Sequence, residues 1–323
     1  VFAALSLDFE DYAADPDVRG PARIATQDAL RRVIEYHLYR DLQRGWRVTA
    51  PNLEDCGLLR FDYEGLAGEE GLLAETGLWE SGFTIRIDRD QEEFVAVPPS
   101  LRGCPPELRE ELLRTLLDVL RRSLAIKVDV LNPQKQLELV EQTTPRLLEG
   151  TVWFLEDEKD LIKSVVAYPR AKKPKESNGF FVSSYGGYGR YLRRSLKPHL
   201  QEGQPWGRDE VDEAIRYLFL ALKGYGILEQ VRSGDVPGYQ INHGSLRWLP
   251  GSGEVRPVDR TRLLDVGDIP PAVNEYFVAC YRSFVTLKCL LEAREHTAQV
   301  PAEERERREQ LFRGGQLPLL FCS

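Results

Sequence analysis

The chain has 323 residues, 42% of them apolar and 29% charged, with a net charge of −8. These values are typical of a globular protein and exclude a disordered tail, and the length is enough for about two or three domains with their own cores. The longest apolar runs fall far short of the roughly 18 to 20 residues that span a bilayer, so we expect a soluble, cytoplasmic protein without membrane contact.

Cysteine and histidine usage argues against a disulfide framework and against the common metal sites. The five cysteines include no C-x-x-C pair, and the four histidines form neither H-x-x-x-H nor H-E-x-x-H. We therefore expect ordinary reduced thiols and no metal ligands.

Residues 1–150 are predicted to form a mostly helical domain. Apolar residues at i, i+3 and i+4 predict a first helix that Thr26 caps and Gly45 ends. A leucine at every fourth position over 108–124 predicts a second helix. Asn132, followed by a proline, predicts the cap of a third.

Residues 151–250 are predicted to form a winged-helix-like domain that contains a basic segment. Its expected elements are two strands, a helix and a pair of wing strands, at 151–155, 162–168, 205–226, 227–231 and 239–241. A helix followed by a Gly-bounded strand, a Gly/Pro turn and a second strand is typical of a hairpin packed on helices. Winged helices bind DNA through a helix and the wing, but many only hold proteins together.

Positive charge gathers between Lys163 and Lys197, where nine basic residues accompany a single acid, Glu176. An acidic protein that concentrates cations in one segment is expected to present them to an anion, most often nucleic acid. The same segment interleaves tyrosines with glycines and arginines in FFVSSYGGYGRYL. Rings between cations suit stacking on bases while phosphates are neutralised.

Three arginines are the expected phosphate contacts, two tyrosines the expected stacking groups, and three lysines are further candidates. In that order they are Arg190, Arg193 and Arg194, then Tyr185 and Tyr188, then Lys172, Lys173 and Lys175. The alternative interpretation is that the lysines lie in a solvated loop and that YGGYG is a tight turn.

Residues 251–269 are rich in Gly, Pro and charge, which indicates a linker. Beyond it, two prolines at 270 and 271 are expected to open an amphipathic helix that runs to Leu287. The short apolar run 317–322 is typical of a strand in the middle of a parallel sheet.

The last residues, AREHTAQVPAEERERREQLFRGGQLPLLFCS, closely resemble the second RecA-like domain of superfamily 2 DEAD/DEAH-box helicases just before helicase motif V. The matching elements are a strand that ends near His296 and Thr297, a helix over 301–312, and a Phe-Arg-x-Gly close that begins at Phe312. The chain is also similar to very large bacterial members of the family, in which a segment like RGWRVTAPNLEDCGLL and a winged-helix-like region precede this motif.

The resemblance implies an α+β fold, in which a mixed helical and winged-helix-like region is followed by a partial RecA-like lobe over 270–323. It implies that the chain is an internal part of a P-loop NTPase, an ATP-dependent helicase that acts on DNA more than on RNA. ATP and Mg²⁺ would be cofactors of the full-length protein, and the remaining helicase domains would be partners. His296 and Thr297 would lie near the strand-binding face. The absence of any Met and an abrupt apolar start at residues 2–9 agree with a fragment.

The chain also departs from the helicase pattern. It has no GxxxxGK[ST] sequence, and its carboxylate clusters at 8–11 and 156–158 lack the context of a DEAH box. We therefore expect no catalytic residue, no ATP bound to this chain and no hydrolysis by it alone. The alternatives are a non-enzymatic winged-helix adaptor for DNA or protein and, less favoured, a hydrolase built on paired carboxylates.

Overall fold

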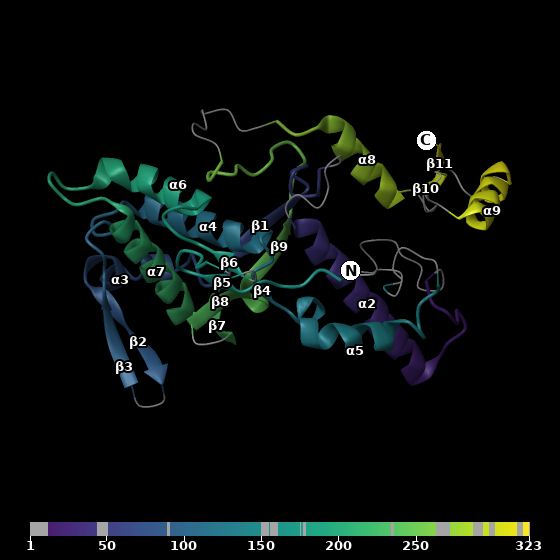
Figure 1. The fold of residues 1–323 in the computed structure, drawn as a ribbon, viewed down its shortest axis with the longest axis horizontal. Coiled ribbons are helices and arrows are strands. Elements are labelled where there is room, and N and C mark those ends of the chain that lie inside the picture. The colour runs from purple at the N-terminus through teal and green to yellow at the C-terminus, as the bar shows by residue number, and fades with distance from the viewer. Residues whose placement is uncertain are drawn as a thin grey trace. The chain divides into compact units, whose positions relative to one another are not determined.

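The protein has an α+β fold, drawn in Figure 1 from a computed structural model. The residues that the structure describes are 12–43, 51–88, 91–149, 155, 161–174, 176, 179–233, 236–262, 272–286, 293–296, 301–314 and 319–322. The chain divides into two compact units, one of residues 7–278 and one that joins residues 1–6 to 279–323. The four-part division expected from the sequence stays a prediction.

The described residues form eight α-helices and eleven strands. The helices are α2 (Gly20–Leu42), α3 (Thr76–Glu80), α4 (Pro106–Arg122), α5 (Pro133–Thr143), α6 (Gly187–Leu196), α7 (Arg208–Gly224), α8 (Glu275–Thr286) and α9 (Ala302–Arg313). The strands are β1 (Leu59–Tyr63), β2 (Gly82–Asp88), β3 (Gln91–Ala96), β4 (Ile126–Lys127), β5 (Ala167–Tyr168), β6 (Phe180–Phe181), β7 (Leu228–Ser233), β8 (Val236–Asn242), β9 (Leu246–Pro250), β10 (Ala293–His296) and β11 (Leu319–Cys322).

Three helices, α4, α6 and α7, pack side by side in the larger unit (Figure 1). The leucine repeat of α4 faces inward, because Leu112, Leu116 and Leu120 have no exposed surface. Helix α7 likewise buries Leu218 and Leu222 completely. Burial of these side chains is the main source of stability for the helical layer.

Strand β8 is the centre of a mixed five-stranded sheet. It pairs along its whole length with β7 in an antiparallel hairpin. Its opposite edge pairs with β4 in parallel at one end and with β5 in antiparallel at Tyr239. Strand β6 extends the sheet in parallel with β5. Two further antiparallel pairs, β1 with β9 and β2 with β3, complete the strands of this unit.

Several elements predicted from the sequence are confirmed. Helices α4, α5 and α7 and the hairpin β7–β8 lie where expected. Asn132 caps α5, since its side-chain oxygen accepts a hydrogen bond from the amide of Gln134 at 2.9 Å.

Other boundaries were wrong. The first helix begins at Gly20 with a proline in its first turn, and Thr26 lies inside it, where its hydroxyl donates to the Ala22 carbonyl at 3.0 Å. The strand expected over 162–168 is reduced to β5, because the amides of Ser164 and Val165 bond instead to loop and helix-end carbonyls. Of the strand expected over 151–155, only residue 155 is described.

The described part of the predicted linker, residues 251–262, forms no helix or strand, yet it is packed. The amide of Gly253 donates to the carbonyl of Gly57 at 2.9 Å. A Cβ at Gly251 would lie 2.0 Å from that same carbonyl oxygen, so only glycine fits there. This part of the segment is therefore held against the loop before β1.

In the smaller unit, β10 and β11 pair in parallel and α9 connects them. The strand and helix expected near the end of the sequence are thus confirmed.

Helix α8 begins later than expected, at Glu275, where the side chain of Asn274 accepts a hydrogen bond from the amide of Tyr276 at 3.1 Å. None of the helices described is both long and apolar enough to cross a membrane.

Candidate nucleic-acid interface

Helix α6 carries the arginines and tyrosines of the basic segment on two different faces. One face is buried and consists of Tyr188, Gly189, Tyr191, Leu192 and Leu196. The other presents Arg190, Arg194 and Lys197, which are all exposed. Their spacing of i, i+4 and i+7 places them on one side of the helix. We call these three cations the α6 stripe.

The buried tyrosines fix α6 to α4. Tyr188 is only 3% exposed, and its hydroxyl donates to the Leu112 carbonyl at 3.1 Å. The hydroxyl of Tyr191 donates to the Glu111 carboxylate at 2.7 Å. Burial raises the pKa of both phenols above the usual value. Tyr188 is therefore a core side chain, and we leave it out of the candidate surface.

Tyr185 lies at the surface, with 58% of its area exposed. The Arg208 guanidinium lies 4.5 Å from the centre of its ring and donates to its hydroxyl at 2.9 Å. Arg190 donates to the Tyr185 carbonyl at 2.9 Å. The structure thus brings an exposed ring together with two cations.

Arg193 and Arg194 lie in the last turn of α6, where positive charge is favoured by the helix dipole. Arg193 is half-buried, and its carbonyl accepts a hydrogen bond from the indole of Trp206 at 3.0 Å. The guanidinium of Arg194 donates to the carbonyl of Arg260 at 3.2 Å, which ties the segment after β9 to α6. Arg194 is the more exposed of the pair.

The candidate lysines lie in the loop between β5 and β6. Lys172 and Lys173 are exposed, and Lys175 lies outside the described residues. Arg170 forms a bidentate ion pair with Glu176 at 2.8 and 2.7 Å, which closes this loop and lowers the pKa of that carboxyl to about 2. Within the described part of the chain, no hydrogen bond or ion pair joins Lys172 or Lys173 to α6.

The N-terminal end of α6 opens on a cavity of about 430 Å³. Arginines from three segments contribute to its wall, Arg122 from the end of α4, Arg190 from α6 and Arg262 from the loop after β9. No Asp or Glu lines it. We call this space the α6 cavity. Arg122 and Arg262 were not predicted from the sequence. The run SSYGG at the start of an amphipathic helix was the only sequence signal for the cavity, and it does not point to either arginine.

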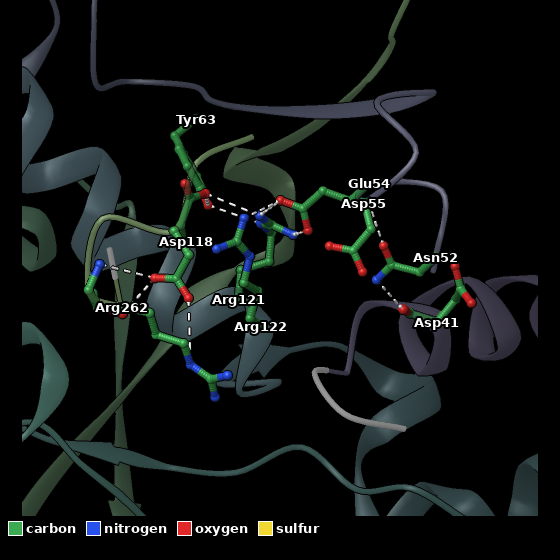
Figure 2. Close-up of polar contacts among 11 residues, drawn as sticks. Asp41, Asn52, Glu54, Asp55, Tyr63, Asp118, Arg121, Arg122 and Arg262 are labelled. Carbon is green, nitrogen blue, oxygen red and sulfur yellow. Dashed lines mark hydrogen bonds and ion pairs between the residues drawn. The ribbon is translucent and has the colours of Figure 1, made fainter. Parts of the chain in front are cut away.

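Arg122 is held by a buried ion cluster (Figure 2). Glu54 accepts hydrogen bonds from Arg121 at 2.9 and 2.6 Å and from Arg122 at 2.7 Å. The side chains of Glu54 and Arg121 are 4% and 1% exposed. Burial disfavours the charged carboxylate, but the two arginines hold its pKa at about 2. A phenol hydroxyl completes the cluster, since Tyr63 donates to Asp118 at 2.7 Å.

The two remaining candidates belong to the smaller unit. His296 ends β10 and lies opposite Cys322 of β11 in the parallel register. Thr297 lies outside the described residues. Their expected place near a bound strand stays a prediction.

The residues described include no candidate metal site. Among them, no group of three or more His, Cys, Asp or Glu side chains is placed to hold a metal ion. Comparison of the chain with protein-family models, with curated proteins and with solved structures found no match.

Proposed function

We propose that this chain is the nucleic-acid-binding central portion of an ATP-dependent helicase, and that the α6 stripe contacts the phosphates of a DNA strand in preference to RNA. The observation that carries the proposal is the stripe itself. Arg190 and Arg194 share one exposed face of α6, and the exposed Lys197 follows directly after the helix in helical conformation. The opposite face of α6 is packed in the core. Rigidly placed cations in a row match the repeated charge of a phosphate backbone.

The order of the elements supports a winged-helix-like region. Helices α6 and α7 are followed directly by the hairpin β7–β8, and β5, which precedes them, pairs antiparallel with β8. The order of strand, two helices and wing agrees with that fold, although β6 lies between β5 and α6, and β4 and α5 separate β5 from α4. In the smaller unit, the parallel pair β10–β11 with α9 between its strands agrees with a piece of a RecA-like lobe.

Helix α7, which precedes the wing, is a poor candidate for reading DNA bases. Its Tyr217 donates to the Leu78 carbonyl of α3, and the Tyr217 ring lies 5.3 Å from that of Phe83 on β2. Its exposed charged positions are two arginines and two acids, Arg208, Asp209, Glu213 and Arg216. The acids would face the phosphates on either side of a major groove, so we expect phosphate contact through α6 with little sequence preference.

In this proposal the chain binds a nucleic-acid strand, and other parts of the helicase hydrolyse the nucleotide. The exposed Tyr185 beside Arg190 offers a ring on which a base can stack. The sequence has no GxxxxGK[ST] phosphate-binding loop, so no step of its action is assigned to ATP or Mg²⁺.

The test is fluorescence-anisotropy binding of the whole chain to single-stranded, forked and duplex DNA, and to matched RNA, over a range of salt. We expect salt-sensitive binding, and we expect the triple variant Arg190→Gln, Arg194→Gln, Lys197→Gln to reduce the slope of log K against log salt by about 2, since each single-strand phosphate contact contributes about 0.7.

The matched control replaces Arg31, Arg102 and Arg216, three exposed arginines away from α6, by Gln. It should bind almost as the wild type does. Absence of binding at low salt would instead favour the non-enzymatic adaptor. Equal losses in the two triple variants would show only a general effect of net charge.

A further inference from the structure

The wall of the α6 cavity carries three arginines, and the carboxylate partners of two of them lie outside the cavity. Glu54 pairs with Arg122 at 2.7 Å, and Asp259 lies 3.9 Å from Arg262. Neither acid lines the cavity. The partners therefore hold the guanidinium groups in place while the cavity itself stays lined by positive charge.

The start of α6 adds backbone donors to the same wall. Gly187, the first residue of α6, lines the cavity, and no side chain caps the helix. The amide of Gly186, the residue before it, already donates to the Ser183 carbonyl at 2.9 Å. The first N–H groups of a helix have no partner within it. Together with the helix dipole they favour an anion at this end.

A serine hydroxyl also borders the cavity. Ser183 lines it and is only 5% exposed as a residue. The adjacent Ser184 is used differently, since its amide and its hydroxyl both donate to Asp212, at 2.6 and 2.9 Å. The hydroxyl of Ser183 is therefore the one of the two that can donate to a ligand in the cavity.

We infer that the α6 cavity binds a phosphate group of the strand that the α6 stripe contacts. The inference rests on the proposed function, because Arg190 belongs to both the stripe and the cavity wall. Guanidinium groups bind phosphate oxygens in pairs of hydrogen bonds, and the Ser183 hydroxyl and the first amides of α6 supply further donors. The group is either a phosphodiester within the strand or the phosphate at its end.

The test uses the whole chain with inorganic phosphate, measured by isothermal titration calorimetry, and with short single strands that carry a 5′-phosphate, a 3′-phosphate or neither. The main variants are Arg262→Gln and Ser183→Ala. Arg262 is 69% exposed, so its replacement should leave the fold intact. Arg122 is not used, because its loss would disturb the buried cluster at Glu54. Arg102→Gln, at an exposed arginine outside both the α6 stripe and the cavity wall, is the control.

We expect inorganic phosphate to bind and Arg262→Gln to weaken that binding about tenfold, as for loss of one charged hydrogen bond. Ser183→Ala should weaken it less, and Arg102→Gln should leave it unchanged. Tighter binding of one phosphorylated strand, lost in Arg262→Gln, would assign the cavity to a strand end. Equal binding of all three strands, weakened in Arg262→Gln and reduced by competing phosphate, would assign it to an internal phosphodiester.

The failures of the two proposals are distinct. If strands bind but phosphate does not, and Arg262→Gln binds strands as the wild type does, the cavity assignment is overturned and the proposed function stands. If phosphate binds in an Arg262-dependent way but no strand does, the cavity is a phosphate site and the nucleic-acid function is overturned. If Arg262→Gln and Ser183→Ala both bind phosphate as tightly as the wild type does, the cavity assignment is also overturned.

Discussion

At the scale of single residues, Glu54 is the most consequential carboxylate described. It compensates two arginines, one of which is 1% exposed. Its replacement by Gln leaves Arg121 buried without that counter-charge, and we expect the free energy of unfolding to fall by about 3–5 kcal/mol. Urea denaturation of the wild type and of Glu54→Gln measures the difference in the free energy of unfolding. The control is Glu64→Gln in the exposed pair with Arg247, where both side chains are more than half exposed and we expect a change of about 1 kcal/mol or less.

The same residue predicts an acid dependence of stability. The pKa of Glu54 falls from 4.5 to about 2 in the folded protein, where burial is outweighed by Arg121 and Arg122. A carboxyl with a depressed folded pKa contributes stability above its unfolded pKa, and that contribution is lost as pH falls through the folded pKa. The wild type should therefore lose stability between pH 4.5 and about 2 more steeply than Glu54→Gln. Parallel curves from urea denaturation at a series of pH values would contradict this.

Single residues also mark a limit of sequence reasoning. Alternating tyrosines and arginines look like a stacking surface, but on a helix the same pattern separates a core face from a cationic face. Tyr188 and Arg190 differ in burial for this reason. The sequence identified two cations of the stripe, Arg190 and Arg194, but not Lys197. The cavity depended on Arg122 and Arg262, which lie far apart along the chain and meet only through tertiary packing.

At the scale of elements, the packing of α6 depends on a glycine. A Cβ at Gly189 would lie 2.2 Å from the Ser183 carbonyl oxygen, whereas one at Gly187 would have no atom nearer than 3.5 Å. Gly189→Ala should push the serine loop off α6 and cost about 1–3 kcal/mol, as overpacking does. Gly187→Ala is the matched control and should cost little. Thermal unfolding distinguishes them, and equal melting temperatures would contradict the close packing.

Helix α5 offers a second test, at its cap. Asn132→Ala removes the acceptor for the Gln134 amide and should cost about 1 kcal/mol, while Asn132→Asp keeps a side-chain oxygen and should cost less. Urea midpoints of the two variants provide the comparison. The prediction fails if the Ala variant is as stable as the Asp variant.

Elements were predictable where their signals are local. The leucine period of α4, the Asn-Pro start of α5 and the turn between β7 and β8 can each be read from a few neighbouring residues. Helix α6 was not assigned, because its glycines are equally typical of a turn. The strand expected over 162–168 was overestimated, because its extent depends on hydrogen bonds to residues such as Leu131 and Leu124 that are distant in sequence.

At the scale of the whole molecule, the larger unit holds the described core. Every side chain found buried among the described residues lies between Tyr12 and Val278. A chain of residues 7–278 is therefore expected to unfold cooperatively, with a melting temperature within about 4 °C of the full chain. A chain of residues 7–226, which lacks the hairpin β7–β8, should show no cooperative transition in calorimetry. Failure of the first chain to fold would show that residues outside it are required.

The pairing of β8 bears on how the protein is made. This seven-residue strand joins β4 and β5, and the amide of Ile241 also donates to the Ala125 carbonyl at 2.7 Å. Residues near 125 leave the ribosome long before their partners near 241, so the leucine face of α4 is synthesised well ahead of the sheet beside it. Contacts so far apart in sequence form slowly and leave apolar surface open in the meantime. The leucine face of α4 therefore stays uncovered on this side until β8 emerges.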